Sequence, residues 1–324
     1  MSIIAQAISN DNTKLSINGV EFTNNHGVPF ETAIFAGYHS TLYSGGAPRV
    51  GKLSTTTLIG PFRKAIYGML QPESTEPQDV NFLLASAKGT AMHQGMTNAL
   101  TAYDSGYVCE QRIETEVDGW KISGEFDILT PDKQIKDLKF VSNYNLKKLQ
   151  EDMLILQPGM SLEEMYEQTP TYFKYQAQLS VYYYLLNDPE VKPYASILFM
   201  LNNGSDMGKF KVDSEVTFPL WPREATQEFI ENRVAIIKQH LADGTLPLCS
   251  DAERGWKGPE FKLQRISPTN GTFTTVRGSK FTDEVKFREF CRKSARMGDV
   301  EISTLATATM CNYCSFSSIC DQPL

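Results

Sequence analysis

The chain lacks any apolar run long enough to cross a membrane. No stretch approaches the roughly 18 to 20 consecutive apolar residues that a membrane-spanning helix requires. Its first residues do not follow the basic-then-apolar layout of a secretion signal. Internal repeats and low-complexity tracts are absent too, so a repeat architecture is not expected. These absences predict a soluble, intracellular protein that has no membrane partner.

An excess of positive charge is also missing. The chain has 31 Lys and Arg against 38 Asp and Glu, a net charge of -7 and a pI of about 5.3. This balance disfavours a uniformly basic surface that coats nucleic acid. Residues 131–150 are a local exception, with five lysines and two aspartates, or 5 - 2 = +3. The segment is either a basic groove, in which Lys136 contacts nucleic acid, or a solvated charged face.

Helix signals and strand signals alternate along the chain. Residues 1–50 have no clear period and are expected to form strands and loops, whereas the run STTTLIGPFRKAIYGML from Ser54 predicts a helix. Three short alternating runs after Tyr107 predict an antiparallel meander. Further helices are predicted at 81–101, 146–154, 170–186, 224–241 and 282–295, and further strands at 195–201 and 209–220. With 41% hydrophobic residues in 324, this order predicts an α/β fold with a small mixed sheet flanked by helices.

A candidate metal site lies on the predicted meander. Asp137 and Lys139 are two residues apart on one strand, so their side chains share a face. The turn after Asp127 brings that carboxylate beside Asp137. Carboxylates hold Mg or Mn next to a phosphate, and a lysine supplies positive charge there. Leu138 can pack into the core and leave its carbonyl to the metal, although an isolated Asp-x-Lys is more often a solvated strand edge.

Further polar candidates flank the meander. His93, in the string KGTAMHQ, offers an imidazole to the metal, or is a structural histidine on a helix flank. Tyr175, Gln178 and Tyr182 share one face of a later helix and are expected to line a groove that binds nucleic acid. Gly124 leaves room for a backbone or a substrate to approach the strand closely.

Three of the six cysteines crowd into the string MCNYCSFSSIC near the C-terminus. In an intracellular protein, such clustering favours metal binding over disulfides. Cys311 and Cys314 form a CxxC pair, and Cys320 follows after five residues. The candidates for a fourth thiolate are Cys109, Cys249 and Cys291. Four thiolates suit either a [4Fe–4S] cluster or a tetrahedral zinc ion.

The strings GTAMH, GEFD, DLK and QLSVY follow one another within residues 88–182. In order and spacing they resemble the motifs of the RecB-like PD-(D/E)XK nucleases, which are a histidine-bearing helix, GxxD, (D/E)xK and QxxxY. The resemblance implies a restriction-endonuclease-like core at residues 81–245. Residues 1–80 would form an N-terminal region with the opening helix, and residues 246–324 a C-terminal extension with the metal cluster.

The resemblance also implies roles for single residues. One or two Mg or Mn ions would be held by His93, Asp127, Asp137 and the backbone carbonyl of Leu138. Together with Asp127 and Asp137, three further residues would complete the catalytic set. Of these, Lys139 would position or activate the attacking water, while Gln178 and Tyr182 would contact the substrate and brace the site.

The C-terminal triplet is similar to that of iron–sulfur members of this superfamily, the AddB type and the CRISPR-associated RecB-like exonucleases. Those members commonly carry a first cysteine before an arginine in the opening helix, but here Arg63 follows Gly-Pro-Phe. The string PLCSDAERGW resembles a segment of phage-type members, which points to Cys249. The implied ligands of a structural [4Fe–4S] cluster, with zinc as the alternative, are Cys249, Cys311, Cys314 and Cys320.

Taken together, the resemblance implies a metal-dependent DNA exonuclease of replication, recombination or repair, acting 5′-to-3′ on single strands. Its partners would be DNA ends or single-stranded DNA and proteins of replication or recombination, in the cytoplasm of a bacterium or a phage-infected cell. The alternative is a catalytically silent nucleic-acid-binding or assembly subunit with a nuclease fold. The presence of Asp127, Asp137 and Lys139 together favours the enzyme.

Overall fold

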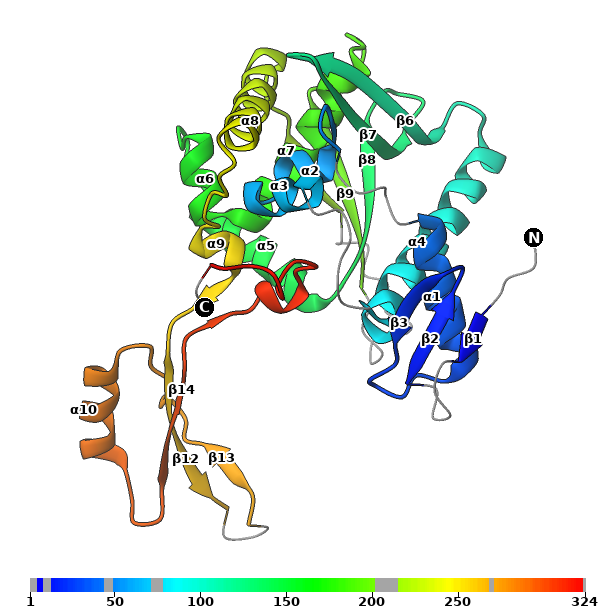
Figure 1. Ribbon diagram of the computed structural model, residues 1–324. Helices are drawn as coiled ribbons and strands as arrows, with labels where there is room; N and C mark the ends of the chain where they lie inside the picture. The colour runs from blue at the N-terminus through cyan, green and yellow to red at the C-terminus, as the bar shows by residue number, and fades with distance from the viewer. Residues whose placement is uncertain are drawn as a thin grey trace. The chain divides into compact units, whose positions relative to one another are not determined.

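The computed structural model describes residues 5–7, 13–43, 49–70, 78–201, 215–267 and 271–322 (Figure 1). The chain divides into two compact units, Met1–Pro247 and Leu248–Leu324, each with its own apolar core. No helix among the described residues is long and apolar enough to cross a membrane.

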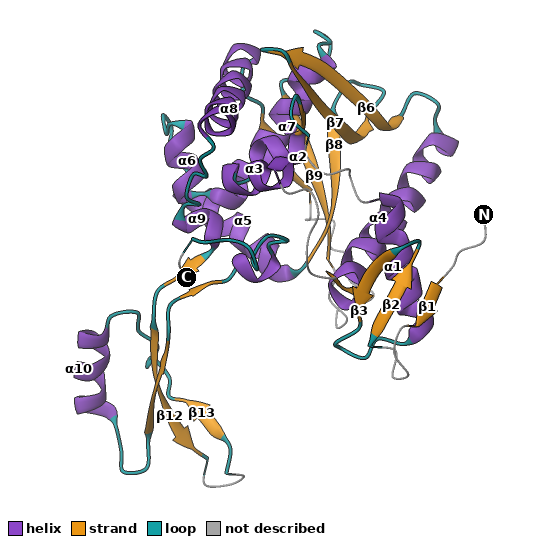
Figure 2. Cartoon of the chain, viewed as in Figure 1, coloured by secondary structure: helices purple, strands orange, loops and turns teal. Residues whose placement is uncertain are grey.

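A six-stranded mixed sheet forms the centre of the larger unit (Figure 2). Its strands are β4 (Lys52–Ser54), β6 (Val108–Val117), β7 (Trp120–Leu129), β8 (Ile135–Val141), β9 (Tyr194–Leu201) and β10 (Glu215–Pro219). The order is β10-β9-β8-β7-β4, and β6 also pairs with β7. Neighbours β6, β7 and β8 are antiparallel, whereas β8 runs parallel to β9 and β4 parallel to β7. The predicted meander and the mixed α/β class are confirmed.

Helices pack on both faces of this sheet. On one face, α7 (Pro170–Leu186) packs over Ile135 and Phe199, and on the other, α4 (Val80–Tyr103) packs over Leu138. The remaining helices around the sheet are α2 (Thr55–Ile59), α3 (Phe62–Leu70), α5 (Asn143–Ile155), α6 (Leu162–Gln168) and α8 (Arg223–Asp243). Because side chains alternate along β8, Asp137 and Lys139 point toward α7, while Leu138 points toward α4.

Two helix predictions needed correction. The single helix expected from Ser54 is two helices, α2 and α3, because Gly60 takes an extended backbone and Pro61 has no amide hydrogen to continue the first one. Residues 1–50 also contain a helix, α1 (Phe30–Tyr43). It packs on a small sheet of β1 (Ala5–Ala7), β2 (Lys14–Ile17), β3 (Val20–Thr23) and β5 (Gln78–Asp79). Alanines on α1 allow this close packing, which a search for apolar periodicity does not detect.

The smaller unit is built on a three-stranded antiparallel sheet. Strand β12 (Glu260–Ile266) lies between β13 (Phe273–Thr275) and β14 (Val300–Thr304), and α10 (Glu284–Ser294) covers one face. A short helix α9 (Asp251–Arg254) and the pair β11 (Trp256–Lys257) and β15 (Thr307–Ala308) precede the C-terminal tail. Cys291 of α10 is buried against Leu263, so it serves as a small apolar residue.

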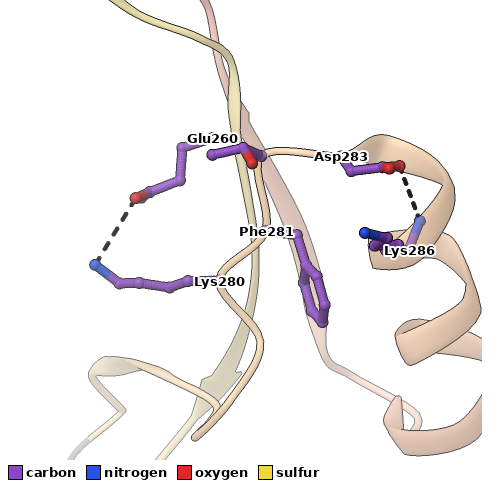
Figure 3. Close-up of a pocket in the computed structure, with 6 residues that line it drawn as sticks. Glu260, Lys280, Phe281, Asp283 and Lys286 are labelled. Atoms are coloured by element: carbon purple, nitrogen blue, oxygen red, sulfur yellow. Dashed lines mark hydrogen bonds and ion pairs between the residues drawn. The ribbon is translucent and has the colours of Figure 1, made fainter. Parts of the chain in front are cut away.

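A hollow of about 290 Å³ lies beside the start of α10 (Figure 3). The Asp283 carboxylate on its wall accepts hydrogen bonds from the backbone N–H groups of Val285 and Lys286 and so caps the helix. Lys280 lies 3.9 Å from the Glu260 carboxylate. These charged groups stabilise the local fold and do not converge on the hollow.

Candidate active site

A distortion in the β6–β7 hairpin brings Glu110 and Asp127 together. The two strands pair on either side of these residues, but the ladder is interrupted between them. Glu110 has a left-handed backbone with φ 52°, a conformation that costs a residue with a side chain about 1–3 kcal/mol. Beyond the interruption, Ile128 packs beneath α4 although Phe126 packs beneath α7. The irregular backbone at Glu110 therefore changes the direction in which the Glu110 and Asp127 side chains point, compared with a regular β-ladder.

The Asp127 carboxylate reaches the next strand. Its Oδ2 accepts a hydrogen bond from the backbone N–H of Leu138 at 2.6 Å, so it lies beside the strand that carries Asp137 and Lys139. The Asp137 side chain is 2% exposed, and its Oδ2 is 2.6 Å from Lys139 Nζ. The hairpin predicted from the sequence thus brings the two aspartates and the lysine into one site.

His93 reaches the same site from α4 on the other face of the sheet. Its Nε2 donates a hydrogen bond to the Leu138 carbonyl at 2.7 Å. The other ring nitrogen, Nδ1, lies 3.6 Å from Asp127 Oδ2 and 3.9 Å from Glu110 Oε1. Burial is the main influence that lowers the pKa of His93, which favours the neutral ring, whose Nδ1 lone pair would face the carboxylates.

The Leu138 carbonyl, which was expected to bind the metal, lies against the His93 imidazole. It accepts a hydrogen bond from the ring, which leaves the second lone pair of the oxygen for another partner. Histidines that bind metals through one ring nitrogen usually donate the other N–H to a carbonyl or carboxylate, which fixes the tautomer. In this structure Leu138 therefore orients His93, and the donor that faces the carboxylates is Nδ1.

One nitrogen and two carboxylate oxygens form a candidate metal site. Donor atoms of His93, Glu110 and Asp127 all lie within 4.8 Å of one another. Glu110 Oε1 is buried and accepts no hydrogen bond from any residue that the structure describes. A buried carboxylate oxygen without a donor is costly, and a divalent cation would satisfy it. These donors suit Mg or Mn.

Glu110 was missed by the sequence analysis, although a signal for it exists. Asp118 and Gly119 both have positive φ, 48° and 72°, as in the two-residue turns that close tight hairpins. A hairpin closed by these two residues places residue 110 opposite residue 127, because 110 + 127 equals 118 + 119. Treating the Asp-Gly turn as a fixed register would have added this glutamate to the predicted metal ligands.

Gln178 and Tyr182 of α7 complete the other side of the site. Gln178 Nε2 donates to Tyr182 Oη at 2.8 Å and lies 3.5 Å from Asp137 Oδ1. A Cβ atom on Gly124 would lie 2.7 Å from the Tyr182 ring and 2.6 Å from Thr55 Oγ1. The room that was expected to admit a substrate at Gly124 is thus filled by Tyr182 and Thr55.

Two residues expected to bind nucleic acid lie elsewhere. The Tyr175 ring is 8% exposed and packs edge-on against Phe199, with ring centroids 5.6 Å apart, so it belongs to the core. Lys136 points to the opposite face of β8 from Asp137, and its Nζ is 2.9 Å from the Glu215 carboxylate. Helical spacing alone did not distinguish buried Tyr175 from Gln178 and Tyr182. The local excess of lysines did not show that Lys136 forms an ion pair.

The carboxylates of the site repel one another in the absence of a cation. Burial, and then the charge of Asp137, raise the pKa of Asp127 to about 8. Burial, Glu125 and Asp137 raise the pKa of Glu110. Burial by itself would lower the pKa of Lys139, but Asp137 and Asp127 outweigh it and raise that pKa, so the ammonium stays charged. Such an accumulation of negative charge around one lysine favours cation binding.

The four predicted cluster cysteines are all partly buried residues of the smaller unit. Gln322 closes the tail on Cys249: its Oε1 accepts from the Cys249 N–H and its Nε2 donates to the Cys249 carbonyl, both at 2.9 Å. Burial, and then the neighbouring thiols of Cys314 and Cys320, raise the pKa of Cys311. The tail that carries the triplet therefore returns to the segment that carries Cys249.

Comparison with known proteins gives little further information. No family model matches the chain, and no curated protein matches it. Among solved structures, one described as "Crystal structure of SSO0001" has a TM-score of 0.41 and 13% sequence identity. That match covers 64% of this chain and 87% of the other. A likeness at this level carries no argument about activity.

The contact between Gly124 and Tyr182 yields a stability prediction. We expect Gly124→Ala to lower the free energy of unfolding by about 1–3 kcal/mol, because the added methyl group must displace a buried ring. Gly95→Ala is the matched control, since a Cβ there meets nothing within 4 Å in the exposed middle of α4. We expect the control to be stabilised by about 0.5–1 kcal/mol in urea unfolding. Equal stability of both variants would contradict the packing described.

The raised pKa of Asp127 predicts pH-dependent cation affinity. Below about pH 8 this carboxyl is protonated in the metal-free protein, so a cation must displace the proton to bind. We expect the dissociation constant for Mn to fall as the pH rises from 6 to 8 and to level off above that, with proton release measurable by calorimetry in buffers of different ionisation enthalpy. An affinity independent of pH over this range would show that Asp127 is not a ligand.

Proposed function

We propose that this chain is a Mg- or Mn-dependent nuclease that hydrolyses phosphodiester bonds of DNA. The observation that carries the proposal is the convergence of donor atoms from His93, Glu110 and Asp127 next to the Asp137–Lys139 pair. The buried, unsatisfied oxygen of Glu110 supports a cation at this point. A bound Mg or Mn ion would polarise the phosphate and make water a stronger nucleophile.

The chain's own residues would supply the remaining requirements of the reaction. The Lys139 ammonium is kept charged by Asp137 and Asp127, and it would stabilise negative charge that develops on the phosphate or hold the attacking water. Gln178 lies against Asp137 and is itself bound to Tyr182, so the pair would hold that carboxylate in place. The Leu138 carbonyl would keep His93 in the tautomer that presents Nδ1.

The choice of DNA as substrate rests on the ordered motifs in the sequence. Their resemblance to RecB-like PD-(D/E)XK nucleases favours an exonuclease of replication, recombination or repair, acting 5′-to-3′ on single strands and assisted by proteins of those processes. The alternative is a catalytically silent binding or assembly subunit. The ion pair between Lys139 and Asp137, next to an unsatisfied donor set, favours the enzyme.

We further propose that the smaller unit carries a structural [4Fe–4S] cluster, with zinc as the alternative. Cys249, Cys311, Cys314 and Cys320 would hold it, and the closure of Gln322 on Cys249 supports this set. When bound, the cluster would stabilise a tail that otherwise contains little regular structure. The alternative cysteines, Cys109 and Cys291, pack with apolar neighbours in the cores of their own units.

Cleavage of end-labelled DNA tests the proposed activity. We expect wild-type protein to degrade single- or double-stranded DNA with Mn or Mg, and Lys139→Ala to lose about 10²–10³-fold in rate. We expect Glu110→Gln to weaken cleavage and also Mn binding measured by electron paramagnetic resonance. The control is Glu116→Gln, an exposed glutamate of the same strand. If wild-type protein binds DNA but does not cleave it with either ion, the silent-subunit alternative is the better account.

Metal analysis tests the cysteine assignment independently of activity. In protein purified without oxygen, we expect iron and acid-labile sulfide that are lost in Cys249→Ser and Cys311→Ser but kept in Cys109→Ala. Zinc without iron would establish the alternative metal. Retention of the metal in Cys249→Ser would mean that the fourth ligand lies elsewhere.

A further inference from the structure

Lys174 extends the polar face of α7 that includes Gln178 and Tyr182. The three residues are spaced by four, so they lie above one another on the helix, about one turn apart. Gln178 lies against Asp137, and Tyr182 follows it toward the C-terminal end of α7. Lys174 therefore lies one turn further toward the start of α7, where it is accessible to solvent although neighbouring atoms crowd its ammonium group.

A second exposed lysine, Lys64, comes from α3. Its neighbour Arg63 is buried, whereas Lys64 faces solvent. Burial, and then the positive charges of Lys139 and Lys64, lower the pKa of Lys174, so these lysines are electrostatic neighbours. Lys64 and Lys174 lie on helices that both contact α2, and α7 also contacts β8, the strand that carries Lys139.

Lys64 and Lys174 also differ from Lys133 and Lys136 in their surroundings. Lys133 lies 3.0 Å from the Asp188 carboxylate, and Lys136 lies 2.9 Å from that of Glu215. By contrast, no carboxylate within the described ranges forms an ion pair with Lys64 or Lys174. Like charges that influence one another without a carboxylate partner are unfavourable unless an anion lies between them.

We propose that Lys174 and Lys64 bind backbone phosphates of the DNA strand next to the scissile phosphate. This inference rests on the proposed nuclease function and adds to it the path of the substrate. The strand would leave the His93–Glu110–Asp127 metal site past Lys139 and run toward the start of α7 and α3. Phosphate contacts of this kind position a strand without selecting its sequence.

Salt-dependent DNA binding by the full chain tests this path. The probe is a fluorescent single-stranded oligonucleotide, measured by anisotropy with Ca in place of Mn. We expect Lys174→Gln and Lys64→Gln each to weaken binding and to lower the slope of log Kd against log salt by about 0.7, the value for one phosphate contact on a single strand. The control is Lys133→Gln, which removes a lysine already paired with Asp188 and should leave the slope unchanged.

Steady-state cleavage separates this inference from the proposed function. At saturating DNA, we expect Lys174→Gln and Lys64→Gln to keep the wild-type kcat and to raise KM, because the metal site and Lys139 are intact. If the wild type cleaves DNA and both variants bind it with the wild-type slope, the lysines are a solvated pair and the inference is overturned. If the wild type binds Mn but does not cleave, the proposed function fails, while lowered slopes would still support the phosphate contacts.

Discussion

The peptide groups of Leu138 join three of the elements that make the site, β7, β8 and α4. Its N–H donates to Asp127 of β7, its carbonyl accepts from His93 of α4, and its side chain is 1% exposed in the core between sheet and helix. A central strand would normally use such backbone groups in its ladder, but β7 and β8 pair only at the turn end of their hairpin. Because the pairing is short, the N–H and carbonyl of Leu138 are available to hold Asp127 and His93, two residues of the candidate metal site.

Strain and charge burial are concentrated at the same place. Glu110 adopts an unfavourable backbone conformation, and the pKa values of Glu110 and Asp127 are raised because each carboxyl group is buried and lies near the charge of Asp137. Folding to this state without a cation is costly, so the surrounding packing has to offset it. Phe126, Ile135 and the α7 aromatic residues form the large core that does so. Cation binding would recover part of that cost as affinity.

The C-terminal part of the chain differs from the larger unit in what can stabilise it. The cores of the larger unit hold its helices and sheets together, and buried Arg63 secures the end of that unit by donating to the carbonyls of Leu246 and Pro247. Beyond that point, the tail after β15 has one short turn of helix and few buried apolar side chains. Such a segment needs another source of stability, which four thiolates around a metal would provide.

The amino-acid sequence by itself determined the local pieces of this protein. Alternation of apolar residues and turn signals indicated the meander and the shared face of Asp137 and Lys139, because strand period and tight turns are local properties. Only the tertiary structure decided which side chains of elements distant in sequence contact one another. It set the Leu138 carbonyl against His93, buried Tyr175 and paired Lys136 with Glu215. These outcomes depend on which face of one element packs on another, and packing is a property of the assembled core, not of spacing along the chain.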